Sequence, residues 1–182
     1  MDLKDLGNLA GMQGGTGGIP NMSKLGGSFS GLGLGMPEYV KSNEFGVRTS
    51  RTFDGVEDYE LPSLDIDSVT FHSGAILDGI IVVYSDGSTV HHGGSGGGAH
   101  KISLAGDSIK RIYGVCKADF SGHKVLTNIC LETASGKKYG PYGSQSNGER
   151  LEISKQGHKL VALFGSADGN YISSLGAYLV KL

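Results

Sequence analysis

Three stretches of the chain share one pattern, which is a glycine, three residues, a variable fifth position and then an apolar-rich strand. The stretches are GAILDGIIVVY from Gly74, GHKVLTNICLE from Gly122 and GNYISSLGAYL from Gly169. Their starts lie 48 and then 47 residues apart, and a period of this length indicates repeated supersecondary units. We therefore expect three similar units within one domain.

A second feature has the same period. The loop GGSGGG begins at Gly93, GPYG begins at Gly140, and Gly46 lies one period before Gly93. Each unit thus combines a Gly-x-x-x-X loop with a later glycine turn. The third unit reaches Leu182 before such a turn occurs, so we expect the segment around Gly46 to supply it. The N-terminal strand would then complete the last unit and close a three-sided body.

The segments between these loops have the composition of short β-strands, and none sustains the pattern of an amphipathic helix. Asp86-Gly87 predicts a hairpin with a type I′ turn, because that dipeptide supplies positive φ angles. Short strands at regular spacing predict a sandwich, a barrel or a prism. The expected strands are 68–74, 79–92, 100–104, 109–116, 124–133, 150–154, 158–165 and 171–180.

The 182 residues suit one domain with a segment left over. With 16 basic and 18 acidic residues the chain has no basic excess for nucleic acid. No run approaches the length of a membrane span, so we expect a soluble protein without membrane insertion. No signal peptide is visible at the start, which leaves two localisations open: cytoplasmic, or secreted with the signal already removed.

Residues 1–36 hold 11 of the 32 glycines and few charges, so we expect a low-complexity arm before a domain at 37–182. The arm is either a disordered tail or a segment that docks on another subunit or partner, since it also contains many apolar residues. Cys116 and Cys130 flank His123 symmetrically. A hairpin there could bring them together, so both a disulfide and two separate thiols stay open.

Four stretches, HSGAILDGIIVVYSDG, HHGGSGGGAHKISL, KKYGPYG and FGSADGNYISSLGAYL, resemble the signature segments of jacalin-related lectins of the mannose-binding type, in the same order. The resemblance covers roughly residues 46–182. It implies an all-β fold, the β-prism I of three Greek-key four-stranded sheets with pseudo-threefold symmetry. It also implies a protein that binds sugars at one end of the prism, without metal, cofactor or catalysis.

A hexose presents neighbouring hydroxyls, which a carboxylate can accept while backbone N–H groups donate in return. In the resembling family, the Asp loop of a unit works with the glycine turn that follows it. Only the first unit has both an Asp in its Gly-x-x-x-X loop and a glycine-rich turn. In the second unit Leu126 stands at the position of the acid. The predicted carbohydrate site consists of Gly74, Ala75, Ile76, Leu77, Asp78, Gly93, Gly94, Ser95 and Gly96.

The third unit is a degraded secondary sugar site, comprising Gly169, Asn170, Tyr171 and Ser173, because serine stands in the acid position. Its facing loop 46–50 lacks paired glycines, and Asp168 is the nearest substitute acid, at a spacing that does not fit the motif. Tyr171 could either stack on a sugar or pack inside the protein.

The leading hypothesis is a lectin for mannose- or glucose-type glycans, made multivalent as a homo-oligomer, possibly through residues 1–36. The alternative is a structural protein that kept the prism, lost sugar binding and assembles through the arm.

An Asp before Gly is often only a turn former, which weakens the case for Asp78 alone. His91, His92 and His100 flank the glycine loop, but we expect them to be ordinary strand residues and predict no metal site. We also predict no enzyme, because no nucleophile–base constellation appears.

Overall fold

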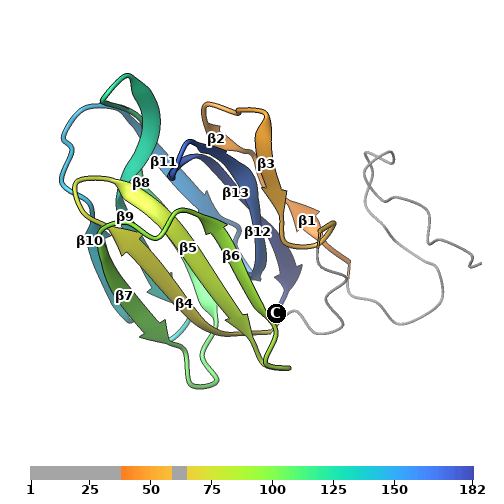
Figure 1. Ribbon diagram of the computed structural model, residues 1–182. Helices are drawn as coiled ribbons and strands as arrows, with labels where there is room; N and C mark the ends of the chain where they lie inside the picture. The colour runs from red at the N-terminus through yellow and green to blue at the C-terminus, as the bar shows by residue number, and fades with distance from the viewer. Residues whose placement is uncertain (1–37, 59–64) are drawn as a thin grey trace, which may run out of the picture.

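The structure is a computed structural model that describes residues 38–58 and 65–182. In these two ranges the regular elements are all β-strands, and none of the residues is helical. The strands form three sheets arranged as the sides of a prism around one main hydrophobic core (Figure 1). The predicted all-β prism is therefore confirmed.

The first sheet lies at the front in Figure 1 and has the strand order β6-β5-β4-β7. Its strands β4, β5 and β6 follow one another as hairpins, and β7 returns to pair with β4, which is the Greek-key order. The bounds are Ile66–Ser73 for β4, Leu77–Tyr84 for β5, Thr89–Gly93 for β6 and Gly98–Ser103 for β7.

The second sheet repeats this arrangement with the order β10-β9-β8-β11. Its central hairpin is long, and the paired strands β8 and β9 carry three irregularities in their register. The bounds are Ile109–Phe120 for β8, His123–Thr133 for β9, Lys138–Tyr142 for β10 and Glu149–Ser154 for β11.

The third sheet is built from both ends of the described chain. Its centre is the hairpin of β12 (His158–Asp168) and β13 (Tyr171–Lys181). Strand β3 (Arg51–Asp54) pairs with β12, while β1 (Val40–Lys41) and β2 (Phe45–Gly46) both pair with β13. The N-terminal segment therefore completes the third unit, as predicted. A single bridge between Leu160 and Ile109 joins this sheet to the second one.

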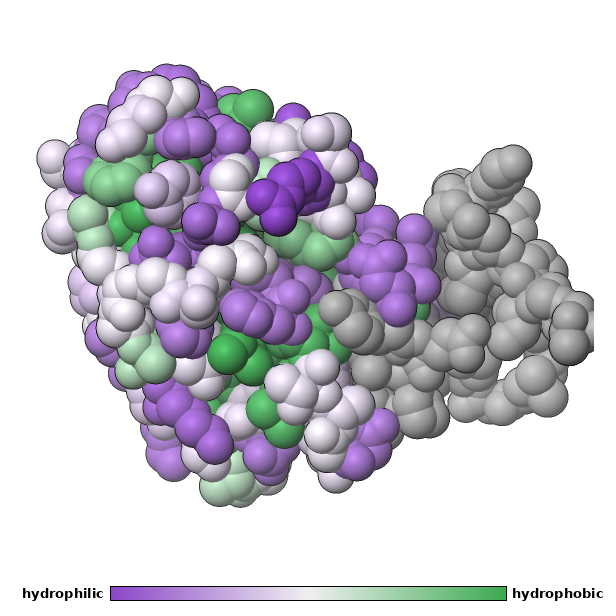
Figure 2. All heavy atoms as spheres, viewed as in Figure 1, coloured by the Kyte–Doolittle hydropathy of each residue, from purple (hydrophilic) through white to green (hydrophobic). Residues whose placement is uncertain are grey.

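The core lies between the three sheets, because alternate side chains of each strand point inward. Phe71, Ile80, Ile112, Leu131 and Leu175 are each 0% exposed and represent all three sheets. The face toward the viewer in Figure 2 mixes hydrophilic and hydrophobic residues, and several hydrophobic ones gather in its lower middle part. Burial of the shared inner faces is the main source of stability for such a fold.

The hairpin predicted at Asp86-Gly87 is present between β5 and β6, but the predicted type I′ turn is wrong. Only Gly87 has a positive φ, 86°, whereas a type I′ turn needs two successive positive angles. The carboxylate of Asp86 accepts hydrogen bonds from the backbone N–H and the hydroxyl of Ser88, at 2.9 and 2.6 Å. These local bonds stabilise a longer loop that the dipeptide alone does not specify.

Cys116 and Cys130 are two separate buried thiols, not a disulfide. The β8–β9 hairpin does turn at Gly122, but the turn pairs Phe120 with His123 and is therefore not centred on His123. The same offset places Cys130 opposite Tyr113, while Cys116 lies opposite Glu149 of β11. Burial raises the pKa of both thiols. The open alternative of a bridge within the hairpin is therefore resolved in favour of free cysteines.

Candidate functional site

The repeated hairpin turns gather at one end of the prism, the upper end in Figure 1. They are the turns between β4 and β5, between β8 and β9, and between β12 and β13. Ile76 of the first turn packs with Ala118 and Val125 of the second unit, and Phe120 and Tyr171 contact the same small cluster. The threefold repeat thus brings three distant loops to one surface.

Asp78 lies at the start of β5, directly beside the glycine loop between β6 and β7. Its backbone carbonyl accepts a hydrogen bond from the N–H of Gly94, at 2.8 Å. A Cβ added at Gly96 would lie only 2.8 Å from Oδ1 of Asp78. The structure therefore brings together the two parts of the predicted site, with the main chain of Gly96 against the carboxylate.

The carboxyl group of Asp78 is largely withdrawn from water, since the residue is 9% exposed. This desolvation raises its pKa, against the opposing effects of the Gly74 backbone N–H and of nearby His72. A carboxylate with few water contacts gains more from each hydroxyl that donates to it than one in bulk solvent. The environment of Asp78 thus suits hydrogen bonding to a neutral polyol.

The other residues of the predicted Asp loop anchor it. Ile76 and Leu77 are buried, so their side chains hold the loop against the protein interior. The carbonyl of Ala75 accepts hydrogen bonds from the Ser144 N–H, at 2.8 Å, and from the Thr127 hydroxyl, at 3.0 Å. These bonds come from the second unit, which therefore helps to hold the loop of the first in place.

The glycine loop fits its position because it has little room for side chains. A Cβ at Gly94 would lie 2.6 Å from the carbonyl oxygen of Asn170, so the loop packs on the β12–β13 turn. Gly97 has a φ of 67°, a conformation that side chains disfavour. Ser95 and Gly96 are exposed, and Gly93 ends β6. The loop thus contacts the third unit at Gly94, whereas Ser95 and Gly96 are open to solvent.

The second unit has no acceptor at the corresponding place. Leu126 occupies the acid position and is 0% exposed, packed in the main core. The predicted glycine turn at Gly140 falls at an irregularity within strand β10, because the register of β10 with β9 shifts between Tyr139 and Tyr142. Gly140 has a φ of 97°, and the longer loop of this unit follows after Gly143.

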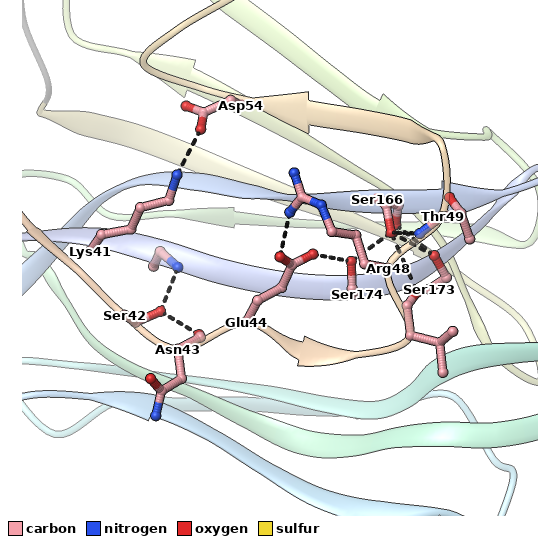
Figure 3. A network of polar contacts seen from close by, with 12 residues as sticks. Lys41, Ser42, Asn43, Glu44, Arg48, Thr49, Asp54, Ser166, Ser173 and Ser174 are labelled. Carbon is pink, nitrogen blue, oxygen red and sulfur yellow. Dashed lines mark hydrogen bonds and ion pairs between the residues drawn. The ribbon is translucent and has the colours of Figure 1, made fainter. Parts of the chain in front are cut away.

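In the third unit, Ser173 is 0% exposed, and its side chain lies beside that of Ser166 (Figure 3). Its hydroxyl donates to the carbonyl of Ser166, at 3.0 Å, and lies 3.0 Å from the Ser166 hydroxyl. The network continues through the Ser174 hydroxyl to the carboxylate of Glu44, which forms an ion pair with Arg48. The hydroxyls of this unit therefore fasten the N-terminal segment to β13.

The remaining residues of the third unit form a different constellation. Oδ2 of Asp168 lies 2.8 Å from Nδ1 of His123, which belongs to the β8–β9 hairpin. The ring of Tyr171 is set edge-on to those of Phe120 and His123. Sequence reasoning missed Phe120 and His123 as members of this end surface, because their position depends on how two units pack.

A cavity of about 320 Å³ lies at the opposite end of the prism, where β4, β8 and β12 begin. Its polar lining includes Asp65, Asp107 and Lys159, and none of the predicted sugar-site residues borders it. The candidate site at Asp78 is accordingly a surface feature of the loops.

Within 38–58 and 65–182, no three His, Cys, Asp or Glu side chains converge in a way that could hold a metal ion. The same ranges contain no helix with the length and apolar character needed to cross a membrane.

The chain belongs to the Jacalin-like lectin domain family, which matches residues 40–178. This family is non-catalytic, which confirms the prediction that the domain is not an enzyme. The chain has no significant match among curated proteins.

Solved structures of plant lectins share the fold. The wild-type Malaysian banana lectin is 28% identical, with a TM-score of 0.68 over 79% of this chain and 99% of that chain. A mannose-binding jacalin-related lectin from Ananas comosus is 21% identical, with a TM-score of 0.66 over 79% and 99%. An artocarpin–mannopentose complex is 16% identical, with a TM-score of 0.64 over 77% and 96%. The predicted resemblance to jacalin-related lectins is therefore confirmed.

Proposed function

We propose that the domain binds mannose- or glucose-type sugars at the end of the prism, through Asp78 and the backbone of the loop from Gly93 to Gly96. The observation that carries this proposal is the close approach of Gly96 to a buried carboxylate. That arrangement pairs a strong acceptor with main-chain N–H groups, which is the combination that vicinal hydroxyls need.

Two relatives are named as mannose binders or were solved with a mannose oligomer, which supports the proposed sugar type. The proposed binding uses one site per domain, because Leu126 is in the core and the Ser173 hydroxyl is engaged internally. A single shallow sugar site binds weakly, with a Kd of roughly 1 mM, since little apolar area is buried. Useful avidity then requires several linked domains.

The function is tested by isothermal titration calorimetry of the full chain with methyl α-D-mannoside, methyl α-D-glucoside and methyl α-D-galactoside. We expect millimolar binding of the first two and weaker binding of the third. Equal binding of all three would contradict the sugar type. Absence of binding to any of them, together with an oligomeric mass in solution, would favour the alternative of an assembly protein that has lost sugar recognition.

Replacing Gly96 with alanine should weaken mannoside binding at least about tenfold, because the new methyl group would press on Oδ1 of Asp78 at 2.8 Å. Gly98→Ala is the matched control in the same loop. Its Cβ would meet its nearest neighbour, Nε2 of His100, at an ordinary 3.6 Å. Calorimetry of both variants checks this, and equal losses of affinity would argue against the contact between loop and carboxylate.

The multivalent part of the proposal concerns residues 1–36, which lie outside the described residues. Sedimentation equilibrium of the full chain and of a chain that begins at Glu38 tests it directly. We expect the full chain to form an oligomer and the shortened chain to lose it. An oligomer that survives the deletion would assign assembly to the prism itself.

A further inference from the structure

The cavity of about 320 Å³ lies at the end of the prism opposite Asp78, which is the lower end in Figure 1, and all three sheets contribute to its walls. The walls are the starts of strands β4, β8 and β12, together with the loop between β7 and β8. That loop is held against β4, because the Leu104 N–H donates to the Asp67 carbonyl at 2.9 Å. The cavity is therefore preformed, and its volume falls at the lower end of the range for small-molecule sites.

The floor of the cavity is apolar. Leu104, Ile109 and Leu160 line it, belong to the main core and are each at most 4% exposed, so the cavity reaches down to the packed interior. An apolar group placed there would leave water and gain dispersion contacts with these side chains. A ligand that uses the whole cavity therefore carries an apolar part, which distinguishes it from a free hexose.

The rim of the cavity carries an excess of negative charge. Within the part of the chain that the structure describes, the carboxylates of Asp65, Asp67 and Asp107 line it together with one ammonium group, that of Lys159. Nζ of Lys159 lies 2.6 Å from Oδ1 of Asp65, so these two charges compensate each other. The carboxylates of Asp67 and Asp107 leave the lining with a formal charge of −2. The rim therefore attracts a cation.

Asp107 is fixed as an ionised acceptor. Its Oδ1 accepts the N–H of Ser108 at 2.8 Å, and its Oδ2 accepts the hydroxyl of Ser135. Hydrogen bonds from the hydroxyls of Ser135 and Thr133 hold the pKa of Asp107 at about 2. No three acidic, His or Cys side chains of the described ranges converge as a metal ion requires. An ammonium group needs less convergence, because its three donors can reach separate acceptors. The rim thus suits an organic ammonium ion better than a metal.

We propose that this cavity binds a small organic cation with an apolar body, of the arylalkylamine class. The ammonium group lies at the rim and donates to the carboxylates of Asp67 and Asp107, while the apolar body lies on the floor formed by Leu104, Ile109 and Leu160. Charge-assisted hydrogen bonds and burial of apolar surface then act on one ligand. This inference does not depend on sugar binding, since no residue of the Asp78 site borders the cavity.

The test is a chemical-shift titration of the isotope-labelled full chain by nuclear magnetic resonance, with 2-phenylethylamine, 2-phenylethanol and ethylamine. The first probe has both parts of the proposed ligand, the second has a neutral hydroxyl in place of the ammonium group, and the third lacks the ring. We expect a Kd of about 1 mM for 2-phenylethylamine, with shifts centred on the amides of Ile109 and Leu160. The other two probes should bind at least about tenfold more weakly.

Substitutions at the rim separate its charge from the shape of the cavity. Asp67→Asn and Asp107→Asn should each weaken binding of 2-phenylethylamine at least about fivefold and leave binding of 2-phenylethanol unchanged. Asp107 also holds Ser135, so the melting temperature of its variant is measured, whereas Asp67 is exposed and its variant should fold like the wild type. Asp119→Asn is the matched control, because it removes the same charge at the other end of the prism and should leave binding unchanged.

The proposal would be overturned by equal affinity for 2-phenylethylamine and 2-phenylethanol, or for 2-phenylethylamine and ethylamine. It would also be overturned if both rim variants kept the wild-type affinity, or if no shifts appeared at about 10 mM amine. Shifts confined to the loops around Asp78 would assign the amine to the sugar site and contradict the cavity. None of these outcomes bears on mannoside binding, which should be the same with and without the amine.

Discussion

Replacing Asp78 with asparagine should lower the affinity for methyl α-D-mannoside at least about a hundredfold, which places it below detection in calorimetry. The carboxylate is the acceptor that the other two units lack, and each hydrogen bond to a charged group contributes about 1.5–3 kcal/mol. Asparagine has the same shape but presents one neutral acceptor and one donor group in its place. Binding that persists in this variant would contradict the assignment of the site.

The same substitution should leave the fold as stable as before or make it more stable at pH 7. Burial raises the pKa of Asp78, so the folded protein holds this proton more tightly than the unfolded chain does. Such a group makes the folded state less stable as pH rises from the unfolded pKa, about 3.9, through the folded pKa. The neutral amide removes this effect. The difference in melting temperature between variant and wild type should therefore be greater at pH 7 than at pH 3.

Ser173→Ala is the matched control and should give the opposite pattern. Ser173 occupies the equivalent position in the third unit, but its hydroxyl bonds to Ser166 inside the protein. Its loss should cost about 1–2 kcal/mol of stability and leave mannoside affinity unchanged. Calorimetry and thermal melts of the two variants together separate a ligand-binding residue from a structural one. Loss of binding in Ser173→Ala alone would move the site to the third unit.

Deleting residues 1–46 should lower the melting temperature by at least about 10 °C, or prevent folding, whereas deleting residues 1–37 should not. The longer deletion removes both N-terminal strands that pair with β13, the Glu44 partner of Ser174, and Phe45, which packs against the main core. A fully buried aromatic side chain contributes about 1.5–3 kcal/mol, of which the partly buried Phe45 supplies a share, and each lost hydrogen bond costs about 0.5–1.5 kcal/mol. For a domain of this size each kcal/mol corresponds to about 2–4 °C.

Circular dichroism melts of the two shortened chains check this expectation. The shorter deletion also tests the predicted domain boundary at residue 37, since a domain that begins there should fold without the preceding arm. If that chain fails to fold, the boundary is wrong. If both chains melt within about 3 °C of each other, the N-terminal strands are not needed to complete the third sheet.

The amino-acid sequence by itself determined the repeat, most of the long strands and the three-sided arrangement, whereas β10 was not expected as a strand. Glycines at a constant spacing set where the hairpins turn, and alternating apolar residues set which faces are buried; both are local properties that survive in a single sequence. The resemblance to jacalin-related lectins, applied to this repeat, predicts that Asp78 lies beside the loop from Gly93. The missing turn of the third unit also followed from the period, and strands β1 and β2 supply it.

The tertiary structure decided what depends on side-chain direction and on contacts between units. Ser173 had the correct spacing for a site residue, yet its hydroxyl points inward to Ser166, because strand position alone does not say where a small polar group finds its partner. The position of the β8–β9 turn, which pairs Phe120 with His123, places Cys130 opposite Tyr113 and not opposite Cys116. The contact of His123 with Asp168 joins residues from two units, and no local pattern carries that information. Packing of the three units against one another therefore determined which side chains lie next to each other at the end of the prism where the hairpin turns gather.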